Sequence, residues 1–370
     1  MKIGVDIRVL MDKHYSGVSI FSLNLLENLI KIDKLNTYSF FYNSFKSINI
    51  DEKFKKSSVQ TFYPNKIFNY LMQDKLALPK IDSVLGGTDI FYMPHINFAS
   101  LSDNTKKVIT IHDLSFLTYP EFFSNRKNFW HKSLNIKKML NKFDKIVSVS
   151  ENTKKDLIEI LGIEESRIEV VYPGLSTFKD VVDDKNVLSK YNIKKDYILY
   201  LGTIEPRKNI VNLIKSYNIL RDRGFSESLV LAGSWGWKTK EISKEWLRSK
   251  YKEDIVFTGY ISEDEKPAFY KNAKIFVYPS LYEGFGFPPL EAMSFSVPVI
   301  SSNNSSLPEV LQDAALLVNS DKNDELCEAM EFLLRDDNLR NNYIIKGKER
   351  CLDFSWEKTA MSYLNIFNKL

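Results

Sequence analysis

The chain has 370 residues, of which 44% are hydrophobic and 26% charged, and its formal net charge is +4. One hydrophobic core rarely serves more than about 250–300 residues, so this length favours two domains. The composition is that of an ordinary globular protein, and the lack of any run of about 18 apolar residues excludes a membrane-spanning helix.

The first half of the chain alternates apolar and amphipathic segments, which predicts parallel strands joined by helices. Asp6 and Arg8 lie within the first apolar segment, so residues 2–9 are predicted to form a strand and not a secretory signal. Together with only two cysteines, this predicts a reducing, cytoplasmic compartment. The other predicted strands are 38–42, 90–93, 108–111 and 145–149. The predicted helices are 18–32, 125–141 and 152–161, the last capped by Ser150 or Asn152.

The segment 126–142, which nearly coincides with the predicted helix 125–141, is basic, with apolar residues such as Phe129 and Trp130 interspersed. It could lie on an anionic membrane surface, or pack on the first domain with its lysines in solvent. Both alternatives stay open. No basic stripe with stacked aromatic residues indicates nucleic-acid binding.

Residues 168–184 are predicted to connect two halves, after which a second α/β pattern begins. Its predicted strands are 197–201, 229–232, 255–257, 275–277 and 299–300, with a helix over 210–220.

Two glutamates, Glu283 and Glu291, enclose a segment with two glycines and two prolines. The prolines suit the first turn of a helix, since the N–H groups they lack would be unpaired there anyway. A strand, a glycine loop and a helix N-terminus together present N–H groups to an anion. Carboxylates within such a site suggest additional binding of hydroxyls, so the segment predicts a nucleotide-sugar site.

Residues 274–310, with the core Tyr-Glu-Gly-Phe-Gly-Phe-Pro-Pro-Leu-Glu-Ala-Met, resemble the donor-site signature of the retaining group 1 glycosyltransferases. The resemblance implies the GT-B fold, in which two Rossmann-like α/β domains with parallel sheets face each other across a cleft. It implies an acceptor-side domain over 1–172, joined by a C-terminal helix at about 356–370, and a donor domain over 173–355.

The resemblance also assigns roles within this signature. Glu291 is expected to bind ribose hydroxyls, and Glu283 to bind sugar hydroxyls and orient the anomeric carbon. The donor-binding backbone is expected at Gly284, Phe285, Gly286 and Phe287, with amides of the last three near the diphosphate.

A second anion site is predicted where the strand 197–201 ends at Gly202 and leads through Arg207 and Lys208 into a helix. Ligands of open α/β sheets bind at the carboxyl ends of strands, and two cations suit a departing diphosphate. Many members of the resembled family carry Arg where this chain has Thr203, so the phosphate role falls to Arg207 and Lys208. Which of these two cations holds the β-phosphate stays open.

Ser296 stands where relatives often have glycine, and we expect that difference to affect packing only.

In the first half, Gly17 follows the first strand at the start of a helix, and its N–H is expected near a phosphate or the sugar. His112 directly follows the strand 108–111, and its surroundings resemble a family signature in which a histidine lies beside the transferred sugar.

We find no Asp-x-Asp pair of the kind that holds a divalent ion beneath a diphosphate, so no metal or other cofactor is expected. Hydrolase and P-loop motifs are also missing. The amino-acid sequences of residues 202–209 and 305–310 most resemble those of bacterial O-antigen mannosyltransferases. GDP-mannose is therefore the first expected donor, and a UDP-hexose or UDP-N-acetylhexosamine the second.

The resemblance implies a saccharide acceptor, often lipid-linked, and thus an enzyme of bacterial surface-polysaccharide synthesis that is cytoplasmic or peripheral on the inner membrane face. Two alternatives are a nucleotide-sugar epimerase, against which the Glu-x7-Glu context argues, and a catalytically silent scaffold.

Overall fold

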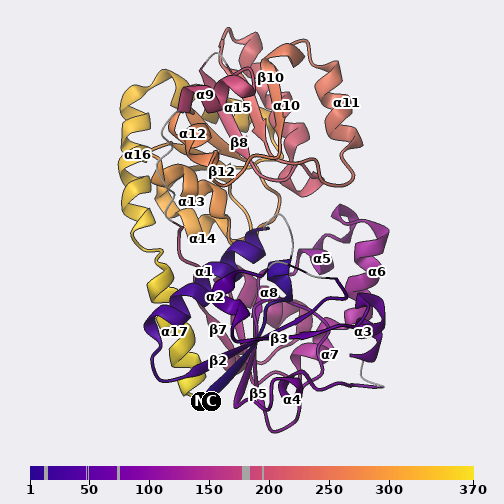
Figure 1. Cartoon of the computed structure of the whole chain (residues 1–370). Helices are drawn as coiled ribbons and strands as arrows, with labels where there is room; N and C mark the ends of the chain where they lie inside the picture. The colour runs from indigo at the N-terminus through magenta and orange to yellow at the C-terminus, as the bar shows by residue number, and fades with distance from the viewer. Residues whose placement is uncertain (12–15, 47, 49, 73–75, 177–183, 194–195) are drawn as a thin grey trace. The chain divides into compact units, whose positions relative to one another are not determined.

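The computed structural model describes residues 1–11, 16–46, 48, 50–72, 76–176, 184–193 and 196–370 (Figure 1). Internal contacts divide the chain into two units. Unit 1 comprises Met1–Leu114, Phe129–Gly174 and Ser355–Leu370, and unit 2 comprises Ser115–Asn128 and Leu175–Phe354. The domain boundaries expected from the sequence stay a prediction, and the part of the predicted connection over 177–183 lies outside the described residues.

Unit 1 contains a parallel sheet with the strand order β3-β2-β1-β4-β5-β6-β7. Its strands are β1 (Lys2–Asp6), β2 (Thr37–Asn43), β3 (Ser58–Thr61), β4 (Ile90–Met93), β5 (Lys106–Ile111), β6 (Lys145–Ser148) and β7 (Ile168–Val170). The five predicted strands are confirmed, although the first ends at Asp6 and is followed by a 3-10 turn, η1 (Arg8–Met11). The segment Ile168–Val170 was predicted to begin the interdomain connection, which was wrong, because it pairs with β6.

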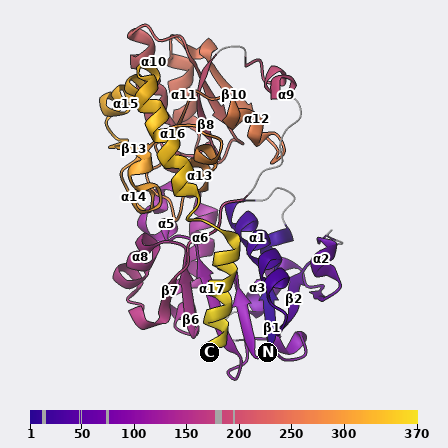
Figure 2. The same cartoon turned by 90° about the vertical axis from the view of Figure 1, so that its left-hand side faces the viewer.

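The main helices of unit 1 are α1 (Gly17–Ile32), α3 (Asn65–Leu71), α8 (Glu151–Leu161) and α17 (Trp356–Asn368), with short α2 (Glu52–Lys55) and α4 (Ile81–Val84). Ser150 caps α8, because its hydroxyl accepts a hydrogen bond from the Thr153 N–H. The C-terminal helix α17 packs beside α1 (Figure 2). Its Tyr363 hydroxyl lies 2.6 Å from that of Thr110 on β5, so the helix is fixed to the sheet by a buried polar contact as well as by apolar packing.

The predicted helix over 125–141 is broken, so that prediction was wrong. It consists of α6 (Asn125–Leu134) and α7 (Ile136–Leu140), separated by Asn135 at φ 47°. Asparagine tolerates this left-handed conformation better than most residues. Its side chain also accepts a hydrogen bond from the Lys138 N–H, which caps the new helix.

Unit 2 contains a second parallel sheet with the strand order β10-β9-β8-β11-β12-β13. Its strands are β8 (Tyr197–Leu201), β9 (Ser228–Ala232), β10 (Ile255–Gly259), β11 (Ile275–Tyr278), β12 (Val299–Ser302) and β13 (Ala315–Val318). Every residue of β8, β9, β11 and β12 is buried, as expected when helices cover both faces of a parallel sheet. The prediction of the first five strands is confirmed, and β13 was not predicted.

The helices of unit 2 include α9 (Asp184–Lys190), α10 (Ile210–Asp222), α11 (Lys240–Arg248), α12 (Lys266–Lys271), α13 (Phe287–Ser294), α14 (Leu307–Leu311), α15 (Asn323–Arg335) and α16 (Asp337–Cys351). The long helix α16 packs on α13 (Figures 1 and 2). None of the helices in the described part of the chain combines the length and hydrophobicity that crossing a bilayer requires.

A segment from the first half of the sequence belongs to unit 2. It contains α5 (Ser115–Thr118) and the turn η2 (Pro120–Phe122) and packs on the loop after β9. The indole N–H of Trp237 donates to the Phe122 carbonyl, and the Lys238 ammonium donates to the Glu121 carbonyl at 2.6 Å. The contacts that define unit 2 therefore include a piece of chain that precedes β6.

The strand order of unit 2 predicts where its ligand site lies. In unit 2 the chain passes from β8 to β9 on one side and returns to β11 on the other, so β8 and β11 flank a reversal of strand order. In open α/β sheets ligands bind outside the carboxyl ends of the strands at such a point. The loops that leave β8 and β11 therefore meet at the expected ligand site of unit 2.

Candidate functional site

The loop after β8 positions two cations. Gly202, at φ 154°, turns the chain away from the strand, and a 3-10 turn, η4 (Pro206–Lys208), carries Arg207 and Lys208. Asn209 then ends the turn at φ 57°, and α10 begins at Ile210. Lys208 is 6% exposed, so its ammonium group is held within the protein.

The loop after β11 carries Glu283 and leads into α13. Its backbone is tied to neighbouring segments: the Leu281 N–H donates to the Arg207 carbonyl at 2.8 Å, and the Glu283 N–H donates to the Ser305 hydroxyl at 2.9 Å. Gly286 precedes the first residue of α13 at φ 99°, and an added Cβ there would lie 2.7 Å from the Leu307 side chain. Glycine is therefore required at this position both by the backbone conformation and by the lack of space.

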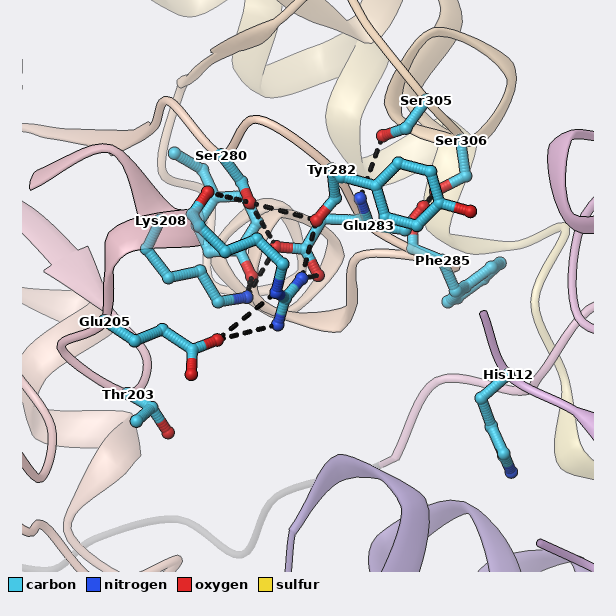
Figure 3. A network of polar contacts seen from close by, with 12 residues as sticks. His112, Thr203, Glu205, Lys208, Ser280, Tyr282, Glu283, Phe285, Ser305 and Ser306 are labelled. Atoms are coloured by element: carbon cyan, nitrogen blue, oxygen red, sulfur yellow. Dashed lines mark hydrogen bonds and ion pairs between the residues drawn. The ribbon is translucent and has the colours of Figure 1, made fainter. Parts of the chain in front are cut away.

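The predicted residues Arg207 and Lys208 both form ion pairs with Glu283, and Figure 3 shows Lys208 and Glu283 side by side. One carboxylate oxygen of Glu283 lies 2.5 Å from the Lys208 ammonium, and the other lies 2.9 Å from the Arg207 guanidinium. Ser280 donates to the same carboxylate at 2.5 Å, and Lys208 also donates to the Tyr278 hydroxyl at 2.6 Å. The side chains that were predicted to bind diphosphate and sugar thus form one buried polar cluster.

Glu205, which the sequence analysis did not select, completes the charge balance of this cluster. It is 4% exposed and accepts hydrogen bonds from the Arg207 guanidinium at 3.0 and 3.2 Å. Two acidic side chains, Glu205 and Glu283, thereby face two basic side chains, Arg207 and Lys208. Glu205 lies two residues before Arg207, within the segment that the sequence predicts as an anion site. This position was the signal that could have identified Glu205.

Electrostatics keep the Glu283 carboxylate ionised. Burial alone would raise the pKa of Glu283, but the charges of Arg207 and Lys208 lower it to about 2. Burial also lowers the pKa of Lys208, assisted by Arg207 and opposed by Glu283. Each charged group therefore depends on the others, and removing one leaves its partners in an unfavourable environment.

Glu291 lies on α13 and has different partners. The Tyr270 hydroxyl on α12 donates to its carboxylate at 2.8 Å, and the Lys266 ammonium lies 3.8 Å away. Sequence reasoning missed both partners, because no local pattern links α12 to α13. Of the remaining predicted donor residues, Gly284, Phe285 and Gly286 lie in the loop before α13, and Phe287 is its first residue.

In unit 1, His112 follows the carboxyl end of β5. Its Nε2 lies 2.9 Å from the Pro94 carbonyl, which can only accept, so Nε2 carries the proton and Nδ1 is left as an acceptor in the neutral ring. Burial lowers the pKa of His112, which favours this neutral form. The Phe21 and His112 rings pack in a T-shaped arrangement with their centres 4.8 Å apart, which restricts the orientation of the imidazole.

Gly17 is the exposed first residue of α1, and an added Cβ there would meet no atom within 4 Å. Neither space nor backbone conformation requires glycine here, in contrast to Gly286. Among the described residues, no group of three or more His, Cys, Asp or Glu side chains is arranged to hold a metal ion.

Family models match two parts of the chain. A model described as "Glycosyl transferases group 1" matches residues 183–350, and one described as "Glycosyltransferase Family 4" matches residues 63–178. The O-antigen chain mannosyltransferase B of Escherichia coli is 29% identical over 379 residues, which is 96% of either chain. The O-antigen chain mannosyltransferase RfbU of Salmonella typhimurium is 28% identical over 58% of this chain and 57% of its own.

Solved structures share the architecture. Sucrose-phosphate synthase from Thermosynechococcus elongatus matches with a TM-score of 0.77 at 18% identity, over 100% of this chain and 98% of its own. HepE from Anabaena, solved with UDP and glucose, matches over the whole of both chains with a TM-score of 0.76 at 15% identity. The fold, the two family models and the nearly full-length relative agree that this chain is a hexosyltransferase of the GT-B fold, whose residues 183–350 match the group 1 glycosyltransferases.

Proposed function

We propose that the protein transfers mannose from GDP-mannose to a lipid-linked saccharide during synthesis of a bacterial surface polysaccharide, with retention of anomeric configuration. The mannosyltransferase relative that matches 96% of the chain supports the sugar, and its O-antigen role supports the acceptor class. A lipid-linked acceptor would place the enzyme at the cytoplasmic face of the membrane.

The buried cluster of Arg207, Lys208 and Glu283 is the observation that carries the donor site. Two cations in the loop after β8 suit the diphosphate, whose charge grows as the sugar bond breaks. On donor binding, the diphosphate would take over these cations, and Glu283 would turn to sugar hydroxyls. Glu291 would bind the ribose, with its carboxylate oriented by Tyr270.

The transfer itself would need no protein nucleophile. In the proposed reaction the departing phosphate accepts the proton of the acceptor hydroxyl on the same face of the sugar. Neutral His112 would accept a hydrogen bond from a sugar hydroxyl at Nδ1. The N–H groups of Gly17, Phe285, Gly286 and Phe287 would add to donor binding, and Arg207 and Lys208 would make a metal ion unnecessary.

A UDP-hexose or UDP-N-acetylhexosamine is the second candidate donor. HepE, which shares the fold over its whole length, was solved with UDP and glucose. The donor sugar is therefore the first property to measure.

The test is a donor panel in buffer with EDTA. GDP-mannose, UDP-glucose, UDP-galactose and UDP-N-acetylhexosamines would be compared by thermal stabilisation and slow hydrolysis, followed by product analysis with a lipid-linked acceptor extract. We expect one donor to stabilise the protein and form a glycoside without metal. Glu283→Gln should lose turnover, and Glu331→Gln, a surface ion-pair control, should keep it.

Each other outcome contradicts part of the proposal. Dependence on added manganese would contradict the metal-free mechanism, and an altered nucleotide-sugar without a glycoside would indicate an epimerase. A protein that binds no donor would be a silent scaffold.

A further inference from the structure

The segment Ser115–Asn128, which belongs to unit 2, is attached to a tryptophan in the loop that follows β9. The Trp237 indole N–H donates to the Phe122 carbonyl, and the Phe123 ring stacks on the indole with ring centres 6.1 Å apart. The Lys127 ammonium lies over the same indole, 3.4 Å from the ring centre. Trp237 therefore holds a cation that the proposed donor site does not use.

The loop that carries Trp237 is fixed against the loop that carries Glu205. The Ile204 N–H donates to the Ser234 carbonyl, and the Gly236 N–H donates to the Ile204 carbonyl, both at 2.9 Å. These are the hydrogen bonds of a parallel strand pair, which extends the pairing of β8 and β9 beyond the ends of both strands. The indole is thereby held in a set position beside the loop after β8.

The segment Ser115–Asn128 also reaches the loop after β11. The Tyr119 ring packs on the Tyr282 ring with centres 5.6 Å apart, and the Tyr282 carbonyl accepts a hydrogen bond from the Arg207 guanidinium at 2.6 Å. The segment that carries Lys127 therefore contacts a residue that itself holds one of the two donor-site cations.

Both Lys127 and Glu205 have unused capacity for a partner. Within the described part of the chain, no carboxylate lies within ion-pair distance of the Lys127 ammonium. The Oε1 atom of Glu205 accepts from Arg207, whereas its Oε2 is buried and accepts no hydrogen bond from any described residue. Figure 3 shows this second oxygen turned away from the dashed contacts, on the side of Thr203. A buried carboxylate oxygen without a donor is unfavourable and rare, so it indicates a partner that arrives in another state.

Lys127 is within electrostatic range of Glu205 and Arg207. Partial burial lowers the pKa of Lys127, the charge of Glu205 raises it, and the charge of Arg207 lowers it. Attraction to Glu205 is therefore strongest when Arg207 is engaged elsewhere. The flexible four-carbon stem of lysine allows its ammonium to change partners without any movement of the backbone.

We propose that Lys127 replaces Arg207 at Glu205 when a diphosphate binds. In the donor-free protein Lys127 is held on the face of Trp237, while Arg207 pairs with Glu205. The diphosphate draws Arg207 away, and the Lys127 ammonium then donates to Oε2 of Glu205, so that this buried carboxylate keeps a cation. The inference rests on the proposed function, in which Arg207 binds the diphosphate. It makes Lys127 a positioning residue that acts through Glu205 and Arg207.

Binding of inorganic pyrophosphate to the full chain tests this exchange independently of nucleoside and sugar. Lys127→Gln should weaken binding on the order of 10-fold in calorimetric titrations, because Glu205 then retains Arg207. Lys127→Arg should restore most of the affinity. Lys348→Gln, which removes an exposed charge of unit 2 on α16, should leave it unchanged. Wild-type affinity in Lys127→Gln would overturn the inference.

A double-mutant cycle separates the exchange from a direct contact between Lys127 and the diphosphate. In Glu205→Gln no carboxylate at this position competes for Arg207, so adding Lys127→Gln should have no further effect on pyrophosphate affinity. Equal losses in both backgrounds would mean direct contact and would contradict the exchange. A wild type that binds no pyrophosphate would overturn the diphosphate site and this inference together, whereas the donor panel can fail while the cycle holds.

The emission of Trp237 gives a second readout, which does not require Glu205→Gln to fold. Pyrophosphate should change this emission in the wild type, because the ammonium leaves the face of the indole, but not in Lys127→Gln. Trp237→Phe identifies the signal among the five tryptophans of the chain. A change in Trp237 emission that persists in Lys127→Gln would show that Lys127 is not the group that moves.

Discussion

Glu283 forms two ion pairs in the donor-free structure, so its carboxylate already occupies the cations that a diphosphate would need. In the proposed function, donor binding would therefore be an exchange of ion-pair partners. Such an arrangement keeps Arg207 and Lys208 in place before the substrate arrives, at the cost of competition with it.

Glu283→Gln tests this exchange. We expect the variant to bind GDP on the order of 10-fold more tightly, because the amide no longer competes for Lys208 and Arg207 (about 1.4 kcal/mol). Turnover should fall on the order of 100-fold or more, since the carboxylate no longer binds the reacting sugar. Calorimetric titration with GDP and initial rates would measure both quantities. Weaker GDP binding together with unchanged turnover would rule out the exchange.

The same contacts affect the choice of substitution. Glu283→Ala would leave the buried Lys208 ammonium without its carboxylate and Arg207 with Glu205 alone, and loss of a buried ion-pair partner costs about 3–5 kcal/mol in comparable cases. A loss of activity in the alanine variant would therefore not distinguish a catalytic role from unfolding. Glutamine keeps the shape of the side chain and makes the result interpretable.

Tyr270 offers a test of the ribose role of Glu291. Tyr270→Phe removes one hydrogen bond, worth about 1 kcal/mol, and frees the carboxylate to rotate. We expect KM for the donor to rise roughly fivefold while kcat changes little, because the ribose does not take part in the reaction. Tyr217→Phe is the matched control, since that buried hydroxyl in the same unit bonds only backbone carbonyls and Arg221. An equal effect in both variants would assign the loss to general destabilisation.

At the scale of elements, the sequence allowed prediction of those strands that are apolar throughout. The strands β4 and β8 were predicted at their observed bounds, because each is fully buried and short enough to exclude a helix. By contrast β3 is only partly buried and β7 has three residues, so neither produces a clear pattern. The break between α6 and α7 depends on one left-handed asparagine, which periodicity does not detect.

The residues of the candidate site that stand in local sequence motifs were predictable, and their partners from other elements were not. Arg207, Lys208, Glu283 and Glu291 stand in local motifs, and the parallel sheet brings the loops after β8 and β11 to one edge. Their partners were not predictable, since Tyr270 and Ser305 reach the site from other elements. Such contacts are properties of the tertiary structure and leave no mark on the neighbouring sequence.

Gly286 and Gly17 both stand at helix starts, and substitution by alanine distinguishes a structural requirement for glycine from a functional one. Gly286→Ala should destabilise unit 2 by about 1–3 kcal/mol, because alanine is strained at φ 99° and meets Leu307. Gly17→Ala should leave stability unchanged or slightly improved, since its Cβ would point into open space in a helical conformation. Thermal unfolding and transfer rates would be measured for both. Because alanine keeps the N–H of residue 17, a Gly17→Ala variant with full activity would exclude only a close approach of the donor to this Cα, and one with reduced activity and full stability would support that approach.

At the scale of the whole molecule, the two units carry different kinds of buried titratable groups. Unit 1 contains His95 and His112, with ring centres 6.3 Å apart, and burial lowers the pKa of both. Unit 2 contains Glu283, whose pKa is lowered to about 2 by its cations. Histidines kept neutral and carboxylates kept charged respond to acid in different pH ranges.

These groups predict that mild acid weakens unit 1 before unit 2. The pKa of His95 is about 4 in the folded protein and near 6.5 when unfolded, so between these values the unfolded chain binds the extra proton. Stability is therefore fully present above about pH 6.5 and falls toward pH 4, by up to about 1.4 kcal/mol per pH unit for this group. The ion-paired Glu283 loses its contribution to stability only as the pH falls from about 4.5, the pKa of the unfolded group, toward 2, its pKa in the folded protein.

Calorimetric scans between pH 7 and pH 5 should show the transition of unit 1 moving to lower temperature more than that of unit 2. His95→Gln should reduce this difference, because glutamine takes up no proton, whereas an unchanged difference would mean that His95 is not the group responsible.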